Sequence, residues 1–276
     1  MLDGIAAPIS LLDLCAAQGH YHLALSHLIL SSEKYRAFYL KMSQRGDLVG
    51  VDNSIVELGH AASVPKVVQA AELVGAHEFV LPDELHDGAR TYELVQQGLD
   101  KLDGMGWMGK IKTIAVPHGK TATEWFRTYL ALIDTDGVDV IGISMFDHEL
   151  FQGGRPSLVK ALNDLRLVSP THQYHMLGCW EDIREPYLLS KYPWVRSMDT
   201  GMPVRLGIKG LLNPGVSYDD GGFGGDDWNQ PMPTYEHRKE DFFAPHKMTV
   251  AIQWNIDLYL RGCGQLMDTK RSSWRS

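Results

Sequence analysis

Three aspartates, Asp199, Asp52 and Asp83, each follow a short apolar run of the kind that forms a buried strand. Glycine and proline, which favour turns, follow Asp199 closely. In a parallel α/β barrel, catalytic residues lie at the carboxyl ends of the strands, because the loops there can vary while the barrel holds them rigidly. Three carboxylates would be costly as bare charges in a structural core. The pattern therefore predicts that the three aspartates meet in one catalytic or ligand-binding site.

The elements that would position these aspartates alternate between strand and helix. Strands are expected over 21–30, 48–52, 78–82, 111–116, 138–144, 173–178 and 192–198. Helices are expected over 33–45, 64–75, 89–102, from Thr121 or Thr123 to about 134, and over 156–167, 181–190 and 248–261. The strands recur about every thirty residues with a helix between each pair, which is the pattern of parallel βα units. The sequence therefore predicts an α/β fold, a closed (β/α)8 barrel of the TIM type.

This barrel needs an eighth strand, which we expect among the first ten or so residues or beyond residue 205. A doubly wound open sheet is the alternative, but no Gly-x-Gly-x-x-Gly turn follows any strand. The 276 residues fit a single barrel domain, 1–276. Its expected parts are a core over about 20–208, a Gly/Asp-rich excursion over 211–245, and a C-terminal helix and basic tail over 246–276. In that helix, the residues expected to pack on the barrel are Val250, Ile252, Ile256 and Leu260.

The composition argues against several classes of protein. The chain has no long apolar segment and no charged-then-apolar leader, so we expect a soluble, cytoplasmic protein without a membrane partner. Cys15, Cys179 and Cys263 are far apart, which argues against a disulfide framework and against a cysteine-rich zinc site. The formal net charge of -8 gives a nucleic-acid partner no support by itself, although a local basic face would suffice.

Two features of the sequence suggest a metal ion. His20, His22 and His27 include a His-x-His pair, which a metal-dependent barrel hydrolase carries at the end of its first strand. Here the pair falls at the start of the expected strand 21–30, the wrong end of a barrel. Carboxylates alternate with glycines over 219–227, but their spacing fits no calcium motif. We therefore expect no metal site, and a metal-dependent barrel hydrolase is kept as an alternative function.

Five motifs follow one another at barrel spacing between about residues 48 and 205. They are Val51-Asp52-Asn53-Ser54, Leu81-Pro82-Asp83-Glu84, Ile141-Gly142-Ile143-Ser144, Leu177-Gly178-Cys179-Trp180-Glu181-Asp182 and Ser197-Met198-Asp199. In this order they resemble the motifs of the queuine/archaeosine tRNA-guanine transglycosylase superfamily. The resemblance is greatest to its branch in phages and bacteria that inserts 7-deazaguanine into DNA. It implies a pentosyltransferase that replaces guanine in DNA with a 7-deazaguanine derivative, in the host cytoplasm if a phage encodes it.

The resemblance implies a role for each aspartate. Asp199 would attack the sugar C1′ and form a covalent glycosyl-aspartate while guanine leaves. Asp52 would give a proton to the leaving base and take one from the incoming base, which requires a carboxyl with a raised pKa. Asp83 would accept hydrogen bonds from the N–H edge of the base and so reject bases that lack those donors.

The same resemblance implies a larger set of substrate-binding residues. Besides Asp83, they are Asn53, Ser54, His118, Gly142, Ile143, Gly178, Trp180 and Arg205. Gly142 and Ile143 would present backbone groups to the base, since a small residue leaves room there. Ser54 stands where the family has glycine and would reshape the base pocket. His118 stands in the turn where the family has a glutamine that helps to read the base, and would replace it.

The surroundings of the site leave several choices open. Trp180 would stack on a base or fill the barrel mouth, and Arg205 and Arg196 suit either phosphate contacts or ion pairs within the barrel. The family's Cys-x-Cys-x-x-Cys and distant zinc-binding histidine are missing, so we expect no zinc or other cofactor and prefer DNA to tRNA. The implied partners are DNA with a single-stranded or flipped-out guanine and a preQ0-like 7-deazaguanine base, with a homodimer left open. A tRNA-guanine transglycosylase and a non-catalytic barrel that binds 7-deazaguanine or nucleic acid are further alternatives.

Overall fold

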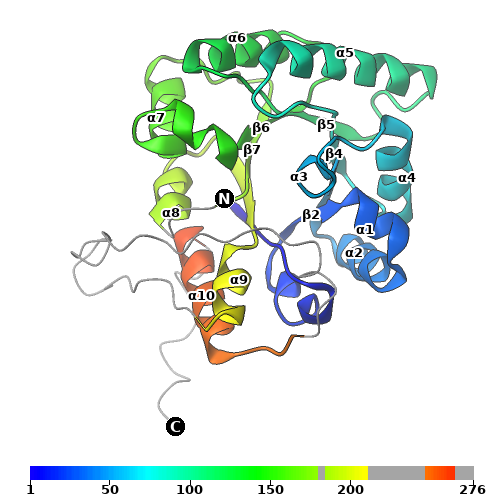
Figure 1. The fold of residues 1–276 in the computed structure, drawn as a ribbon, viewed down its shortest axis with the longest axis vertical. Helices are drawn as coiled ribbons and strands as arrows, with labels where there is room; N and C mark the ends of the chain where they lie inside the picture. Colours follow the sequence, from blue (N-terminus) through cyan, green and yellow to red (C-terminus); the bar gives the residue numbers. More distant parts are fainter. Residues whose placement is uncertain (180–183, 211–245, 265–276) are drawn as a thin grey trace.

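The fold is a closed barrel of eight parallel strands, seen in a computed structural model that describes residues 1–179, 184–210 and 246–264 (Figure 1). The strands are β1 (Leu2–Ile5), β2 (Tyr21–Leu25), β3 (Leu48–Asp52), β4 (Glu78–Val80), β5 (Lys112–Ala115), β6 (Val140–Ser144), β7 (Gln173–Leu177) and β8 (Val195–Thr200). The helices are α1 (Ser26–Ser31), α2 (Glu33–Arg45), α3 (Ile55–Leu58), α4 (Val64–Val74), α5 (Gly88–Gly104), α6 (Ala122–Ile133), α7 (Gly154–Asp164), α8 (Arg184–Ser190), α9 (Met202–Ile208) and α10 (Val250–Gly262). The predicted (β/α)8 barrel is confirmed.

The strand that completes the barrel is β1, within the first ten residues. Its Gly4 lies opposite Tyr21 of β2 and opposite Asp199 of β8. A Cβ atom on Gly4 would lie only 3.0 Å from both the Asp199 Cβ and the Tyr21 carbonyl oxygen, so this close approach of three strands requires glycine. The expected core boundary near residue 20 is therefore wrong, because the barrel begins at Leu2.

Two further elements differ from those expected. The apolar run 21–30 is a strand only as far as Leu25, and helix α1 follows it directly. An unbroken apolar run suits a buried helix as well as a buried strand, so its composition could not locate this boundary. Helix α9 begins just after β8, where glycine and proline suggested a turn. Pro203 occupies the first turn of this helix, a place where the missing backbone N–H of proline costs no hydrogen bond.

The C-terminal helix α10 packs against the barrel beside α9 (Figure 1). Its residues that are buried as predicted are Ile252, Ile256 and Leu260. Val250, by contrast, is 86% exposed, because it is the first residue of the helix. Tyr259 donates a hydrogen bond from its hydroxyl to the Met198 carbonyl of β8 at 3.1 Å. A Cβ atom on Gly207 of α9 would lie 2.4 Å from the Ile252 Cα, so α9 and α10 are in close contact.

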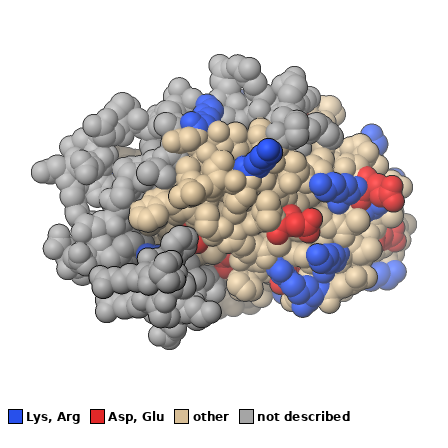
Figure 2. Space-filling model, turned by 90° about the horizontal axis from the view of Figure 1, so that it is seen from below, with Lys and Arg blue, Asp and Glu red and all other residues tan. Residues whose placement is uncertain are grey.

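Some expectations concern parts of the chain that the structure does not describe. The Gly/Asp-rich excursion 211–245 and the basic tail beyond 264 lie outside the described residues. Within the described ranges, no helix has both the length and the apolar character needed to span a membrane. On the face shown in Figure 2, the coloured lysine and arginine side chains are scattered and stand among acidic ones. The visible described surface there does not offer the continuous basic stripe that typically follows a phosphate backbone.

Asp3 is a fully buried carboxyl on β1. One oxygen, Oδ1, lies 3.3 Å from His20 Nδ1, and the other has no hydrogen-bond partner among the described residues. Burial raises the pKa of Asp3 to about 6 from 3.8, although His20 opposes the rise. The folded protein therefore binds this proton more tightly than the unfolded chain does. Ionisation of Asp3 therefore lowers the free energy of unfolding. This stability is lost as the pH rises from about 4 to about 6.

We expect Asp3→Asn to remove this pH dependence. A pKa shift of this size corresponds to about 3 kcal/mol, and unsatisfied amide hydrogens in the variant would offset part of the gain. The variant should be about 1–2 kcal/mol more stable than the wild type at pH 8 and no more stable at pH 4. Urea unfolding at the two pH values measures the difference. An equal effect of the substitution at both would show that Asp3 does not titrate in this range.

Candidate active site

A cavity of about 520 Å³ opens at the carboxyl ends of the strands. Each of the eight strands contributes to its wall, either by its own last residues or by the residues that follow it. Several of the predicted site residues line this cavity. Those with ionisable or amide side chains are Asp52, Asn53, Asp83, His118, Asp199 and Arg205. The structure thus brings the three aspartates together, as the sequence predicted. A concave site with an apolar wall and a few convergent polar groups is typical of a small-molecule site.

Asp199 is the inward-facing carboxylate near the end of β8. Its Oδ1 atom lies 3.1 Å from His175 Nε2 and accepts a hydrogen bond of 3.1 Å from the Gly178 amide. The side chain is 15% exposed, so it is accessible from the cavity while being held from β7. Among the described residues both contacts are made to Oδ1, so Oδ2 is the oxygen available to react with a bound molecule.

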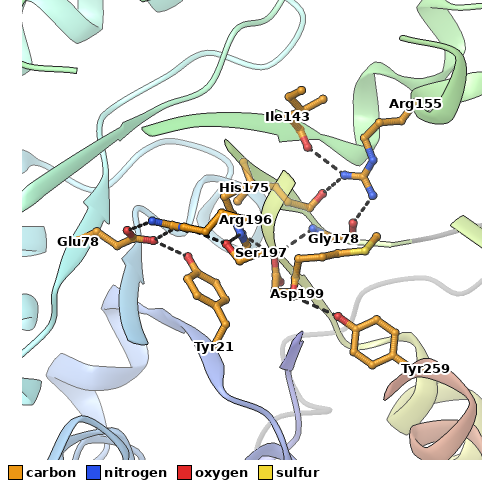
Figure 3. A network of polar contacts seen from close by, with 12 residues as sticks. Tyr21, Glu78, Ile143, Arg155, His175, Gly178, Arg196, Ser197, Asp199 and Tyr259 are labelled. Carbon is orange, nitrogen blue, oxygen red and sulfur yellow. Dashed lines mark hydrogen bonds and ion pairs between the residues drawn. The ribbon is translucent and has the colours of Figure 1, made fainter. Parts of the chain in front are cut away.

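The Gly178 amide is fixed by a buried arginine. Arg155 of α7 donates to the Ile143 carbonyl at 2.9 Å and to the Gly178 carbonyl (Figure 3). It also donates to the Leu177 carbonyl at 2.8 Å, and Glu185 balances its charge at 2.7 Å. Gly178 has a φ of +69°, and a Cβ there would lie 2.5 Å from a methionine sulfur. The positive φ favours glycine at this turn, and the arginine holds the turn in the conformation that directs its amide to the carboxylate of β8.

Asp52, at the end of β3, has a different environment. Its Oδ1 accepts a hydrogen bond of 3.1 Å from the Ser54 amide, which lowers the pKa, but burial and then the charge of Glu57 raise it. Asp83 and Asp199 add to the rise, and the pKa lies well above that of an ordinary aspartate. Asp52 therefore keeps its proton to a higher pH than an ordinary aspartate does, which favours a role as general acid.

Asp83 is held by two protein partners. Asn53 donates its side-chain amide to Oδ1 at 2.7 Å and to the Leu81 carbonyl at 2.8 Å. His118 Nε2 lies 2.8 Å from Oδ2, and the side chains of His118 and Asp83 are 1% and 4% exposed. His118 thus belongs to the site and does not cap the next helix, a role that Thr121 fills. A carboxylate oxygen has more than one acceptor position, so Asp83 can still accept from a ligand in the cavity.

Three predicted residues lie away from the cavity wall, and one is not described. Gly142 faces the barrel interior, where a Cβ would lie 2.7 Å from Leu177 Cδ1. Neither residue lines the cavity, and the Ile143 carbonyl accepts from Arg155, so the expectation that these two residues present backbone groups to a ligand gains no support. Ser54 is buried with its hydroxyl 3.1 Å from that of Ser26, beneath the wall. Trp180 lies outside the described residues.

The histidines of the metal-hydrolase alternative do not reach the site. His22 Nε2 lies 2.9 Å from Asp47 at the amino ends of β2 and β3, and His20 contacts Asp3. These positions are at the opposite end of the barrel from Asp199. Within the described residues, no three His, Cys, Asp or Glu side chains form a group that could hold a metal ion. This geometry gives the metal-dependent hydrolase no supporting observation.

His175, Ser197 and Arg155 contribute to the site but were missed from the sequence. Each is a buried polar residue within a strand or helix, and such a residue is more often a satisfied core residue than a functional one. The sequence contained one indication of where these side chains point. His175 lies two positions before Leu177, and Ser197 lies two positions before Asp199, so each pair is on one face of its strand. Arg196, considered for phosphate binding, instead forms an ion pair with Glu78 inside the barrel.

Comparisons with known proteins identify the fold but not the family. No family model matches the sequence, and no curated protein sequence does. The chain is similar in structure to D-psicose 3-epimerase from Clostridium cellulolyticum H10, with a TM-score of 0.51 and 9% identity over 98% of this chain and 100% of that one. N-acetylneuraminate lyase from Mycoplasma synoviae has a TM-score of 0.44 and 7% identity, over 75% of this chain and 73% of that one. At 9% identity, the similarity to the epimerase shows a shared barrel fold alone.

Proposed function

We propose that this protein is a base-exchange glycosyltransferase that replaces guanine in DNA with a 7-deazaguanine derivative through a glycosyl-aspartate. The observation that carries the proposal is the contrast between two carboxyls in one cavity. Asp199 is bound through one oxygen and has the other available, whereas Asp52 has a raised pKa and can hold a proton. A nucleophile and an acid in different environments are what displacement at a glycosidic carbon requires. The ordered motifs of the sequence supply the substrate class.

The first half of the reaction forms the covalent intermediate. Asp199 Oδ2 attacks C1′ as the bond from C1′ to the guanine nitrogen breaks, and the electron pair of that bond stays with the base. Asp52 gives its proton to the departing guanine, so the base leaves neutral. The products of this half are free guanine, a glycosyl ester of Asp199 and ionised Asp52.

The second half reverses these steps with another base. Ionised Asp52 takes the proton from the ring N–H of the incoming 7-deazaguanine, whose nitrogen attacks C1′ and releases the Asp199 carboxylate. Two displacements at the same carbon retain its configuration. Asp83, held by Asn53 and His118, accepts hydrogen bonds from the N–H edge of both bases. Arg205, from α9, is a cation on the described part of the cavity wall and suits a phosphate of the extruded nucleotide.

The test is an exchange assay with two polynucleotides. The protein is mixed with guanine-containing single-stranded DNA or with tRNA, together with labelled preQ0-like base, and incorporation and denaturation-resistant adducts are followed. Incorporation into DNA is the expected result. Adduct and exchange with tRNA only would keep the reaction and replace the substrate. Neither activity with either polynucleotide, but tight binding of the free base, would favour a non-catalytic binding barrel.

Asp83 provides a test of base recognition. We expect Asp83→Asn to lower kcat/KM for the incoming base by about 10²–10³-fold, because an amide presents a donor towards the donors of the base. His118→Gln is the matched control, since it keeps a donor for Asp83 and should cost less than about tenfold. Steady-state exchange over a range of base concentrations measures both values. Equal losses in the two variants would mean that Asp83 does not read the base.

A further inference from the structure

A row of polar side chains extends from Asp199 through the barrel interior (Figure 3). His175 of β7 and Ser197 of β8 are both fully buried, and they lie opposite one another in the parallel ladder. His175 Nε2 lies 3.1 Å from Asp199 Oδ1, and His175 Nδ1 lies 2.9 Å from the Ser197 hydroxyl. The imidazole therefore bridges Asp199 and Ser197, and both of its nitrogens have partners.

The inner end of this row is a neutralised ion pair. Arg196 donates from Nε to the Ser197 hydroxyl at 3.1 Å. Its two terminal nitrogens lie 2.7 and 2.6 Å from the two oxygens of the fully buried Glu78, which also accepts from the Tyr21 hydroxyl at 3.0 Å. A buried, bidentate pair of this kind has a fixed geometry. Arg196 therefore presents its Nε–H to Ser197 from a rigid position.

The donors and acceptors of these groups set the direction of the hydrogen bonds. A guanidinium has no acceptor, so the Ser197 oxygen accepts from Arg196 and its hydroxyl proton is free to point to His175 Nδ1. Nδ1 is then an acceptor, and the proton of the neutral imidazole lies on Nε2, directed at Asp199. If Nδ1 carried a proton instead, Ser197 would have to accept from two donors, and its own proton would need another acceptor.

We infer that His175 and Ser197 are positioning residues for Asp199, an inference that rests on the proposed function. Ser197, oriented by Arg196, keeps the His175 proton on Nε2, and His175 ties Oδ1 so that Oδ2 faces C1′. Neither residue touches the substrate. In the first half-reaction Oδ2 forms the bond to C1′ and Oδ1 becomes the ester carbonyl oxygen. In the second half the same N–H donors stabilise the carboxylate as it leaves. No proton moves along the row in either half.

The hydrogen-bond direction can be tested without any substrate. Nitrogen-15 spectra of protein labelled at histidine distinguish an imidazole nitrogen that carries a proton from one that accepts a hydrogen bond. The His175 signals are those that disappear in His175→Gln. We expect a protonated Nε2 and an acceptor Nδ1. A proton on Nδ1, alone or with one on Nε2, would overturn the inference. This result does not depend on whether the protein transfers a base.

The effect on Asp199 is tested by two variants of His175. The glutamine amide of His175→Gln can reach the place of Nε2 and still donate to Asp199, whereas the shorter side chain of His175→Asn reaches only the place of Nδ1. We expect single-turnover adduct formation to fall by about 10²-fold in His175→Asn and by less than about tenfold in His175→Gln, with unchanged DNA affinity in both. Equal rates in the two variants, or a matching loss of DNA affinity, would overturn the inference.

Ser197→Ala is the second test, and it keeps the inference open to refutation if His175→Asn does not fold. It removes only one hydroxyl, and adduct formation should fall by about tenfold with unchanged DNA affinity. Wild-type rates in this variant would overturn the role of Ser197. If the wild type itself forms no adduct with DNA or tRNA, the proposed function fails, while the nitrogen-15 result still decides the direction of the hydrogen bonds.

Discussion

Asp199→Asn is expected to abolish both the covalent adduct and base exchange. The amide is nearly the same size as the carboxylate, but its nitrogen is not a nucleophile for C1′, so no glycosyl ester can form. Loss of the covalent route should lower kcat/KM by about 10⁴-fold or more, equivalent to at least about 5 kcal/mol of transition-state stabilisation. The measurement is denaturing electrophoresis of the protein mixed with labelled guanine-containing DNA, with and without the 7-deazaguanine base.

The control for this result is Asp164→Asn. Asp164 is an exposed residue at the end of α7, paired with Lys160, and its replacement removes one negative charge far from the cavity. It should leave the adduct and the exchange rate unchanged. Thermal unfolding of Asp199→Asn within a few degrees of the wild type would show that the barrel is intact. A denaturation-resistant band that persists in Asp199→Asn would mean that another residue is the nucleophile.

Asp52→Asn is expected to slow formation of the adduct by about 10²–10⁴-fold, because the leaving guanine would receive no proton. A matched substrate separates this role from a structural one. Guanine methylated at N7 leaves as a neutral base without taking up a proton, so DNA that carries it should form the adduct at a similar rate with Asp52→Asn and with the wild type. Equal slowing on both DNAs would show that Asp52 does not act as the acid.

The dependence of this step on pH follows from the same carboxyl. Burial and Glu57 raise the pKa of Asp52, so the protonated form persists to a higher pH than in an ordinary aspartate and is lost as the pH rises through the raised pKa. Adduct formation by the wild type should therefore fall as the pH rises through that range. With the N7-methylated DNA this fall should be absent. A fall towards acid instead would assign Asp52 to a role that needs its ionised form.

The strand-end aspartates could be predicted because the information is local. Asp52, Asp83 and Asp199 each end an apolar run, and parallel strands bring such ends to one rim of a barrel. Strand β1 gave almost no signal, since two of its four residues are Asp3 and Gly4. Its place depends on contacts from distant strands, which no window of the sequence contains. Similarly, the direction of the His175 side chain could be known only once the pairing of β7 with β8 was known.

The site also shows why a residue type does not determine its use. Arg196 and Arg205 both lie near Asp199 in the sequence and were equally suited to phosphate. The pairing of β7 with β8 shifts register at Arg196, and its side chain pairs with Glu78 of β4, whereas α9 brings Arg205 to the cavity wall. Gly142 matched a motif, yet its place beneath Leu177 is explained by packing alone. Residues of a type that can take part in chemistry can be found from the sequence, but the residues that they contact depend on the register of the strands.

The pairing of Gly4 with Asp199 has a consequence for the order of events during synthesis. The two residues come from the first and last strands, so this contact is among those with the greatest sequence separation in the barrel. Closing so long a loop costs chain entropy that only the completed sheet offsets, which places such contacts late in folding. A growing chain that already carries Asp52 and Asp83 therefore has no positioned nucleophile until β8 joins β1. Under the proposed function, capture of a nucleic acid by a covalent bond awaits closure of the barrel, and incomplete chains are inert.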